Sequence, residues 1–192
     1  MHGLVNRSIQ RFIRDTYGKE AWDAVAAEAG VASEGFEALL SYENALTDAV
    51  IDSASKRFAK PRGELLEDLG IHLAGIEALR RLLRFGGVDF ADFILSLDEL
   101  PDRARLAVPE LDLPEVSVHP VGGGRFRVIC RGDNPGYGPV FAGILRAIAD
   151  DYGALALIDL DAPAGRVEAI SVELLDARFA TGRQFHLARP DI

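Results

Sequence analysis

The chain has 192 residues, 48% of them hydrophobic, and carries a formal net charge of -9 at pH 7. This length and apolar content suit one ordinary domain, and the negative charge argues against binding to nucleic acid or to an anionic membrane surface. A single cysteine excludes an internal disulfide, and without a basic leader or an apolar run of about 18 residues we expect a cytoplasmic protein with no membrane span.

Each of the first two predicted helices ends at a glycine. Apolar residues recur at spacings of three and four over residues 4–17, and Gly18 is placed to end that helix. The segment 19–30 predicts a second, shorter helix that Gly30 closes. The chain therefore begins with a helical pair.

Two further helices are predicted before residue 90. Ser33 can cap the segment that follows the second helix, and the spacing predicts a helix over 47–59 that Pro61 stops. One long helix is predicted over 63–85, ended by the glycine pair 86–87. The first hundred residues are thus expected to be almost wholly helical.

The stretch 90–108 has the pattern of an amphipathic helix, but Pro101 lies on its apolar face. A proline inside a helix removes a backbone donor and collides with the carbonyl four residues earlier, which costs about 3 kcal/mol unless the helix breaks. Asp98 can cap a helix that restarts there with Pro101 in its first turn. We therefore predict a helix break just before Pro101.

After Pro114 the periodicity changes from helical to alternating. Alternation over 115–121 and 125–131, with the glycines 122–124 between them, predicts a β-hairpin. A helix is predicted next over 140–153, ended by its last residue, which is a glycine.

A second hairpin is predicted from the strands 154–161 and 167–176, and the segment 183–190 can add an edge strand. Helices followed by paired strands indicate an α+β fold: a mostly helical N-terminal part, then a small antiparallel sheet with one interposed helix. The element order is not that of a parallel α/β fold.

The residue types indicate no catalytic or metal site. The histidines, His2, His72, His119 and His186, show no ligand spacing, and no serine lies in a nucleophile motif. Cys130 falls on a predicted strand, where a free cysteine is usually a small hydrophobic residue of the core. The sequence therefore does not indicate an enzyme.

Four segments, taken together and in order, resemble the haem-nitric oxide/oxygen binding domain family, called H-NOX or HNOB. They are 1–30 with Tyr17, Gly18, Glu20 and Trp22, the stretch "LLEDLGIHL" at 65–73, "FADFILSLDELPDRA" at 90–104, and "VFAGILRAIADDYG" at 140–153. The resemblance covers nearly the whole chain. It implies one H-NOX-like domain over 1–192, with a distal helical subdomain at 1–60 and a proximal helix-plus-sheet subdomain at 61–192.

The resemblance also implies a haem pocket whose main contacts have changed. Pro101 in "LDELP" stands where the family has the histidine that ligates the haem iron, and proline has no donor atom. Cys130, Gly132 and Asn134 stand where the family's tyrosine, serine and arginine hold the haem propionates. Pro114 matches the family's proline that packs on the porphyrin. The implied pocket is lined by Pro101, Pro114, Cys130, Gly132, Asn134, Leu4, Leu73 and Leu97.

Three residues remain as substitute iron ligands: His72, His119 and Cys130. Arg131 does not replace the missing propionate contacts, because alternate strand residues point to opposite faces and it faces away if Cys130 faces the pocket. Histidine-ligated haem is therefore predicted to be lost.

Two functions from different classes follow from the resemblance. The leading one is a stand-alone sensory or regulatory domain that signals in trans to a kinase, a cyclic-nucleotide enzyme or a chemotaxis protein. Its pocket then either takes another apolar or tetrapyrrole-like ligand or is filled by side chains. The alternative is a haem-binding NO or O₂ sensor with a substitute ligand, and an enzyme built in the pocket is a third class without sequence support.

Overall fold

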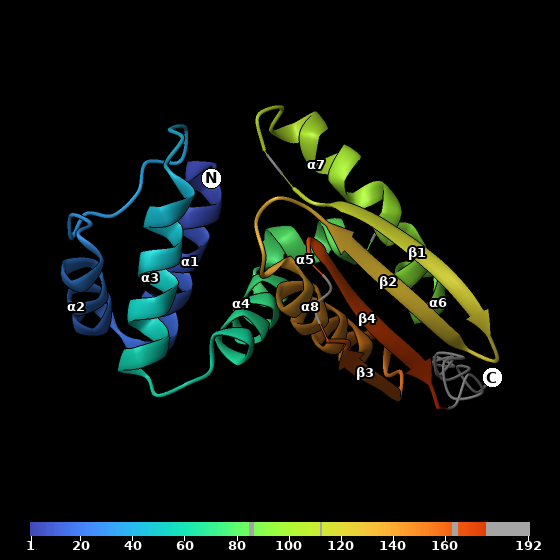
Figure 1. Cartoon of the computed structure of the whole chain (residues 1–192). Helices are drawn as coiled ribbons and strands as arrows, with labels where there is room; N and C mark the ends of the chain where they lie inside the picture. Colours follow the sequence, from blue (N-terminus) through green and yellow to red (C-terminus); the bar gives the residue numbers. More distant parts are fainter. Residues whose placement is uncertain (85–86, 112, 163–164, 176–192) are drawn as a thin grey trace, which may run out of the picture.

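The computed structural model describes residues 1–84, 87–111, 113–162 and 165–175 (Figure 1). The edge strand predicted over 183–190 lies outside these residues. Among the described residues no helix is long and apolar enough to cross a membrane. The elements in order are α1 (Gly3–Tyr17), α2 (Lys19–Ala29), α3 (Asn44–Arg57), α4 (Arg62–Gly75), α5 (Glu77–Arg84), α6 (Phe90–Leu95), a 3₁₀ turn (Ser96–Glu99), α7 (Leu100–Ala107), β1 (Glu115–Gly122), β2 (Arg125–Arg131), α8 (Tyr137–Tyr152), β3 (Ala156–Leu160) and β4 (Val167–Leu174).

Helices α1, α2 and α3 pack with one face of α4 around a first core, which we call the helical core. Trp22 is fully buried there, and its Nε1 donates to the carbonyl of Ser33 over 2.9 Å. Gly30 ends α2 in the left-handed conformation, as predicted. The prediction that Ser33 caps a helix is wrong. The Gln10 amide ties the residues after Ser33 to α1 in a non-helical path, and α3 begins only at Asn44.

The single long helix predicted over 63–85 is also wrong, because the chain turns at Ile76. This residue has extended dihedrals (φ -71°, ψ 115°) and separates α4 from α5. The break has a packing reason. Leu69 of α4 is buried in the helical core, whereas Leu83 of α5 is buried in the other core, beneath the sheet. The bend turns the second half of the segment toward that sheet.

The predicted break before Pro101 is confirmed. A 3₁₀ turn separates α6 from α7, and Pro101 lies in the first turn of α7, where its missing N–H costs no hydrogen bond. The predicted cap at Asp98 is wrong, because Asp98 lies inside the 3₁₀ turn. That turn runs into α7 with helical dihedrals at Glu99 (φ -84°, ψ -12°), so the extended residue that a side-chain cap requires does not exist.

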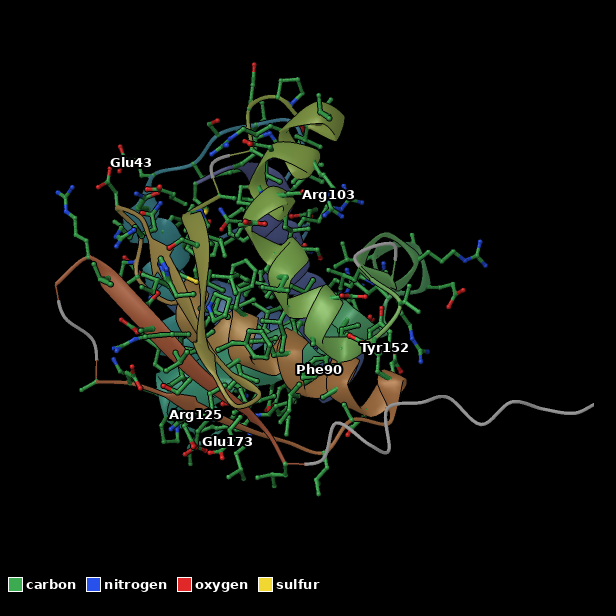
Figure 2. All side chains as sticks on the ribbon, turned by 90° about the vertical axis from the view of Figure 1, so that its right-hand side faces the viewer. Glu43, Phe90, Arg103, Arg125, Tyr152 and Glu173 are labelled. Atoms are coloured by element: carbon green, nitrogen blue, oxygen red, sulfur yellow. The ribbon has the colours of Figure 1, made fainter. Side chains whose placement is uncertain are left out.

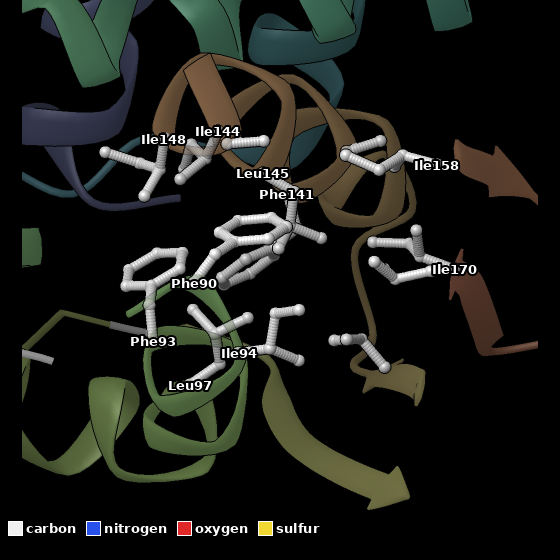
Figure 3. Close-up of a cluster of buried hydrophobic side chains, with 14 of the residues drawn as sticks. Phe90, Phe93, Ile94, Leu97, Phe141, Ile144, Leu145, Ile148, Ile158 and Ile170 are labelled. Atoms are coloured by element: carbon white, nitrogen blue, oxygen red, sulfur yellow. The ribbon is translucent and has the colours of Figure 1, made fainter. Parts of the chain in front are cut away.

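The four strands form one antiparallel sheet in the order β1-β2-β4-β3, which confirms both predicted hairpins and the α+β class. One face packs on α6 and α8 and forms the second core, which we call the sheet core. Figure 3 shows Phe90 and Phe93 of α6 facing Phe141 of α8, with Ile170 of β4 beside them. The opposite face is exposed. It carries Arg125, which pairs across the sheet with Glu173 (Figure 2).

Helices α4 and α8 lie between the two cores and cross in backbone contact (Figure 1). A Cβ atom on Gly70 of α4 would lie 2.0 Å from the Val140 carbonyl oxygen. A Cβ atom on Gly143 of α8 would lie 1.9 Å from the Glu67 carbonyl oxygen. Only glycine permits this approach on both helices. The paired glycines therefore set the distance between the helical core and the sheet core.

Candidate functional site

The predicted site residues fall into separate groups in the structure. Pro114 is buried directly before β1, and a Cβ on Gly132 would lie 3.3 Å from the Pro114 Cβ, so these two residues are neighbours. Cys130 is 2% exposed and pairs with Val116 of β1. The 3₁₀ turn and α7, which carry Leu97 and Pro101, also pack against β1. The structure thus brings Pro114, Cys130 and Gly132 to one end of the β1–β2 hairpin, and packs the elements that carry Leu97 and Pro101 against β1.

Three predicted residues lie elsewhere. Leu4 is half-buried on α1, and Leu73 of α4 packs against the helical core. Asn134 lies in the loop between β2 and α8, where its Oδ1 accepts a hydrogen bond from Asn44 Nδ2 of α3 over 2.5 Å. That contact ties the sheet part of the molecule to the helical part.

A pocket of about 60 Å³ opens beside this contact, between α1, α3, α4 and the β2–α8 loop. Of the eight predicted residues, only Asn134 lines it. The lining residues are Met1, Val5, Ile9, Asn44, Thr47, Asp48, Ile51, Arg62, Leu66, Leu69, Asn134, Pro135, Gly136, Tyr137 and Val140. We call this the interhelical pocket.

The sequence analysis missed the apolar residues of this pocket, although helical spacing shows that they share buried helix faces. Val5 and Ile9 are four residues apart on α1, and Leu66 and Leu69 are three apart on α4, so each pair shares a helix face. Spacing alone does not say that the two faces meet at a pocket, because it reports which residues are buried and not what they are buried against.

Polar groups surround the mouth and wall of the pocket. Arg62 forms ion pairs with Asp48 and Asp52 of α3. Thr47 Oγ1 donates to Asn6 Oδ1 over 2.7 Å, and the other end of that amide, Asn6 Nδ2, has no hydrogen-bond partner among the described residues. A buried donor without a partner costs free energy, so Asn6 marks a place beside the wall where an acceptor would be stabilising.

The loop wall of the pocket is held from behind by a carboxylate. Glu168 of β4 accepts hydrogen bonds from the backbone N–H of Gly136 over 3.0 and 3.1 Å and from that of Gly138 over 2.9 Å. Glu168 pairs with Cys130 across the sheet. The sequence offered no signal for this contact, because the groups that bind the carboxylate are backbone amides.

The three residues predicted as substitute iron ligands lie outside the interhelical pocket. His72 of α4 packs on Phe12 at a ring distance of 5.6 Å, with its Nε2 3.6 Å from Asp15 Oδ2. His119 is exposed on β1. Burial, with a smaller contribution from the negative charge of Glu168, raises the pKa of Cys130 to about 12. The thiol is therefore protonated at neutral pH, whereas the thiolate is the form that ligates metals.

The residues present do not fit a histidine-ligated haem. Pro101 is buried but has no donor atom for iron. The interhelical pocket of about 60 Å³ is well below the roughly 300–1,000 Å³ usual for sites that enclose a cofactor. In the described part of the chain no group of three or more histidine, cysteine or acidic side chains is placed to hold a metal ion.

Comparison with known proteins gives consistent matches. The family model described as Haem-NO-binding matches residues 2–158. The soluble guanylate cyclase gcy-31 of Caenorhabditis elegans is 27% identical over 118 residues, which are 59% of this chain and 17% of that protein, so the chain spans about a sixth of the relative's length.

Solved structures share the fold. An Fe(II) unliganded H-NOX mutant from K. algicida superposes with a TM-score of 0.81 at 14% identity, covering 93% of this chain and 99% of that one. An H-NOX mutant from T. Tengcongensis superposes with a TM-score of 0.77 at 13% identity, covering 92% and 98%. At these identities the superpositions show the fold alone.

Proposed function

This chain belongs to the Haem-NO-binding (HNOB, H-NOX) family, and we propose on that premise that it is a cytoplasmic sensory and regulatory domain that works without histidine-ligated haem. It acts on a separate signalling protein and has no catalytic role of its own. In this proposal residues 1–60 form the distal subdomain and residues 61–192 the proximal one.

The observation that carries the proposal is the buried proline at position 101. Pro101 lies in the first turn of α7, and the turn before it packs against β1. A histidine that ligated iron from this position would need a haem-sized space beside it. Here Phe93, Ile94 and Leu97, which precede Pro101 in the chain, are at most 1% exposed and are packed into the sheet core. We expect side chains to fill the space beside position 101, since a large apolar void would destabilise the core.

The ligand of such a domain is then a small apolar molecule in the interhelical pocket, where apolar side chains from α1, α4 and α8 converge. A tetrapyrrole-like ligand would require those helices to separate. The Gly70 and Gly143 contacts oppose that separation, because they hold α4 and α8 in backbone contact.

The partner is a kinase, a cyclic-nucleotide enzyme or a chemotaxis protein. The name of the relative, a soluble guanylate cyclase, supports a cyclic-nucleotide enzyme as the partner. The matched segment is only 17% of that protein, so most of the relative lies outside the part that resembles this chain. The net charge of -9 favours a partner with a basic docking surface, because complementary charge raises association rates and selects partners.

The test is an absorption titration with haemin, with reductant and carbon monoxide added afterwards. We expect no stoichiometric Soret band from the wild-type protein. A Soret band that shifts with carbon monoxide would overturn the proposal and favour a haem sensor with a substitute ligand. The variant Pro101→His supplies the missing donor, and Pro109→His, at an exposed position, is its matched control. Because the space beside position 101 is filled, we expect neither variant to take up haem. Uptake by Pro101→His alone would show that a haem-sized space remains and that only the iron ligand is missing.

A further inference from the structure

A groove of about 580 Å³ lies between α1 and the segment 31–43. None of the residues that line it lines the interhelical pocket. Its volume falls within the roughly 300–1,000 Å³ that is usual for sites binding small molecules. Its walls belong to two different segments of the chain and carry charges of opposite sign. We call it the charged groove.

One wall of the charged groove is basic. Arg7, Arg11 and Arg14 follow one another on α1 at spacings of four and three, so they share one exposed face of that helix. Arg11 pairs with Asp15, but in the described part of the chain Arg7 and Arg14 form neither an ion pair nor a hydrogen bond. Like charges four residues apart destabilise a helix. An anion bound beside this stripe would therefore be stabilising.

The opposite wall is acidic. Glu34 and Glu37 of the segment 31–43 are exposed and line the groove. Among the residues that the structure describes, neither carboxylate forms an ion pair with an arginine of α1. The carboxylates of one wall therefore do not neutralise the guanidinium groups of the other. Each wall keeps charge that a ligand of the right polarity can compensate.

The floor between the walls is buried and fixed. Phe36 is 5% exposed and Gln10 is 6% exposed. The Gln10 amide joins the two walls, because its Nε2 donates to the Glu34 carbonyl over 3.0 Å and its Oε1 accepts from the Phe36 N–H over 3.2 Å. Gly35 has φ +87°, and a Cβ there would lie 2.2 Å from Gln10 Nε2, so only glycine permits this approach. The acidic wall is thus held in place against α1.

We propose that the charged groove binds a small zwitterion whose carboxylate and ammonium lie at opposite ends of the molecule, as in an ω-amino acid or a short peptide. The carboxylate contacts Arg7 and Arg14, whose planar guanidinium groups match carboxylate oxygens. The ammonium contacts Glu34 and Glu37, and the apolar middle of the ligand lies over Phe36. This site is additional to the interhelical pocket and does not rest on the proposed function.

Electrostatics favours this class over simple ions. A simple anion is attracted by the basic wall and repelled by the acidic one, and a simple cation meets the reverse. A zwitterion with both charges on one carbon cannot place each charge against its own wall. Only a ligand with separated charges is attracted by both walls at once.

The experiment follows the backbone amide signals of the full chain by NMR as probes are added. The first two probes, ε-aminocaproate and dialanine, carry their charges at opposite ends. Norleucine, an isomer of ε-aminocaproate, carries both charges on one carbon, whereas hexanoate and hexylamine carry one charge each. We expect the first two to shift the signals of residues 7–14 and 34–37 with dissociation constants of about 1–10 mM. The other three should bind at least about fivefold more weakly.

The probes also distinguish the two sources of such a zwitterion. Tighter binding of dialanine assigns the groove to peptides, and tighter binding of ε-aminocaproate assigns it to ω-amino acids. The inference is wrong if neither probe binds, if norleucine binds as tightly as its isomer, or if the shifted signals lie outside the groove.

Paired variants test each wall. In Arg7→Gln/Arg14→Gln, ε-aminocaproate should bind no more tightly than hexylamine does to the same variant. In Glu34→Gln/Glu37→Gln, it should bind no more tightly than hexanoate does. Because exposed ion pairs are individually weak, each paired variant should lose about three- to tenfold in affinity. All four side chains are exposed, so the fold should be kept, which circular dichroism checks.

Two single variants are the matched controls. Arg131 and Glu43 are exposed, lie outside the groove, and form no ion pair within the described residues. Arg131→Gln and Glu43→Gln should bind ε-aminocaproate as the wild type does. Wild-type affinity in either paired variant, or an equal loss in the controls, would show that the two walls do not hold the ligand.

Discussion

The crossing of α4 and α8 gives the sharpest test of the fold. In Gly70→Ala the new Cβ would lie 2.0 Å from the Val140 carbonyl oxygen, 2.9 Å from its carbon and 3.0 Å from the Ile144 nitrogen. Ordinary van der Waals contact for such an atom begins near 3.4 Å. All three neighbours are backbone atoms, so no side chain can rotate to relieve the contact, and α8 must shift by more than an ångström.

The expected loss follows from two opposing effects. Alanine in place of a helical glycine gains up to about 1 kcal/mol in helix propensity. Overpacking costs typically about 1–3 kcal/mol, and here the shift of α8 also loosens Val140 against the helical core and Ile144 in the sheet core. Because all three close contacts are with backbone atoms, we take the overpacking cost as about 3 kcal/mol. After the gain in helix propensity, we expect Gly70→Ala to lower the free energy of unfolding by about 2–3 kcal/mol.

The measurement is urea unfolding followed by two probes. Fluorescence of Trp22, the only tryptophan in the chain, reports on the helical core, and far-ultraviolet circular dichroism reports on the whole molecule. Gly63→Ala is the matched control, because Gly63 is on the same helix with no heavy atom within 4 Å of the added Cβ. If the two variants were equally stable within about 0.5 kcal/mol, the close crossing of α4 and α8 would be refuted.

Three further predictions concern single side chains. Burial, aided by Arg11 and opposed by Asp15, lowers the pKa of His72 from its ordinary 6.5, so its stabilising contribution is present above about pH 6.5 and is lost as the pH falls. His72→Phe should therefore lose less stability than the wild type between about pH 7.5 and 5.5, and parallel urea midpoints would contradict this. The buried Cys130 thiol, with its pKa raised to about 12, should react with maleimide only on unfolding, so rapid labelling of native protein would show that the thiol is accessible. Gln10→Ala removes the contacts to the Glu34 carbonyl and the Phe36 N–H and should cost about 1–3 kcal/mol in a thermal or urea melt, whereas no change would mean that the 31–43 segment is held by other contacts.

Much of the secondary structure was predictable because its signals are local. Helical spacing identified α1, α2 and α8, and left-handed glycines at positions 30 and 153 ended two of them. The break at Pro101 followed from the covalent structure of proline, which cannot donate a hydrogen bond in the middle of a helix. The family resemblance was confirmed by the match over residues 2–158.

Part of the candidate site was also predictable. The absence of a donor at Pro101 is a property of the residue type. The outward direction of Arg131 followed from strand alternation and agrees with its exposed position. Two contacts of the site could not be predicted, because they join residues far apart in the chain. Pro114 lies beside Gly132, and Asn44 donates a hydrogen bond to Asn134.

The sequence by itself determined most of the helices, both hairpins, the α+β class and the absence of a donor atom at Pro101, since each depends on residue type and on spacing within one segment. Only the tertiary structure decided the bend at Ile76, the place of β4 beside β2, the Gly70–Gly143 crossing, and the carboxylate of Glu168 behind the pocket wall. Periodicity records which face of an element is buried. The partner of that face is chosen by packing among distant segments, and where backbone groups make the contact no side-chain pattern records it.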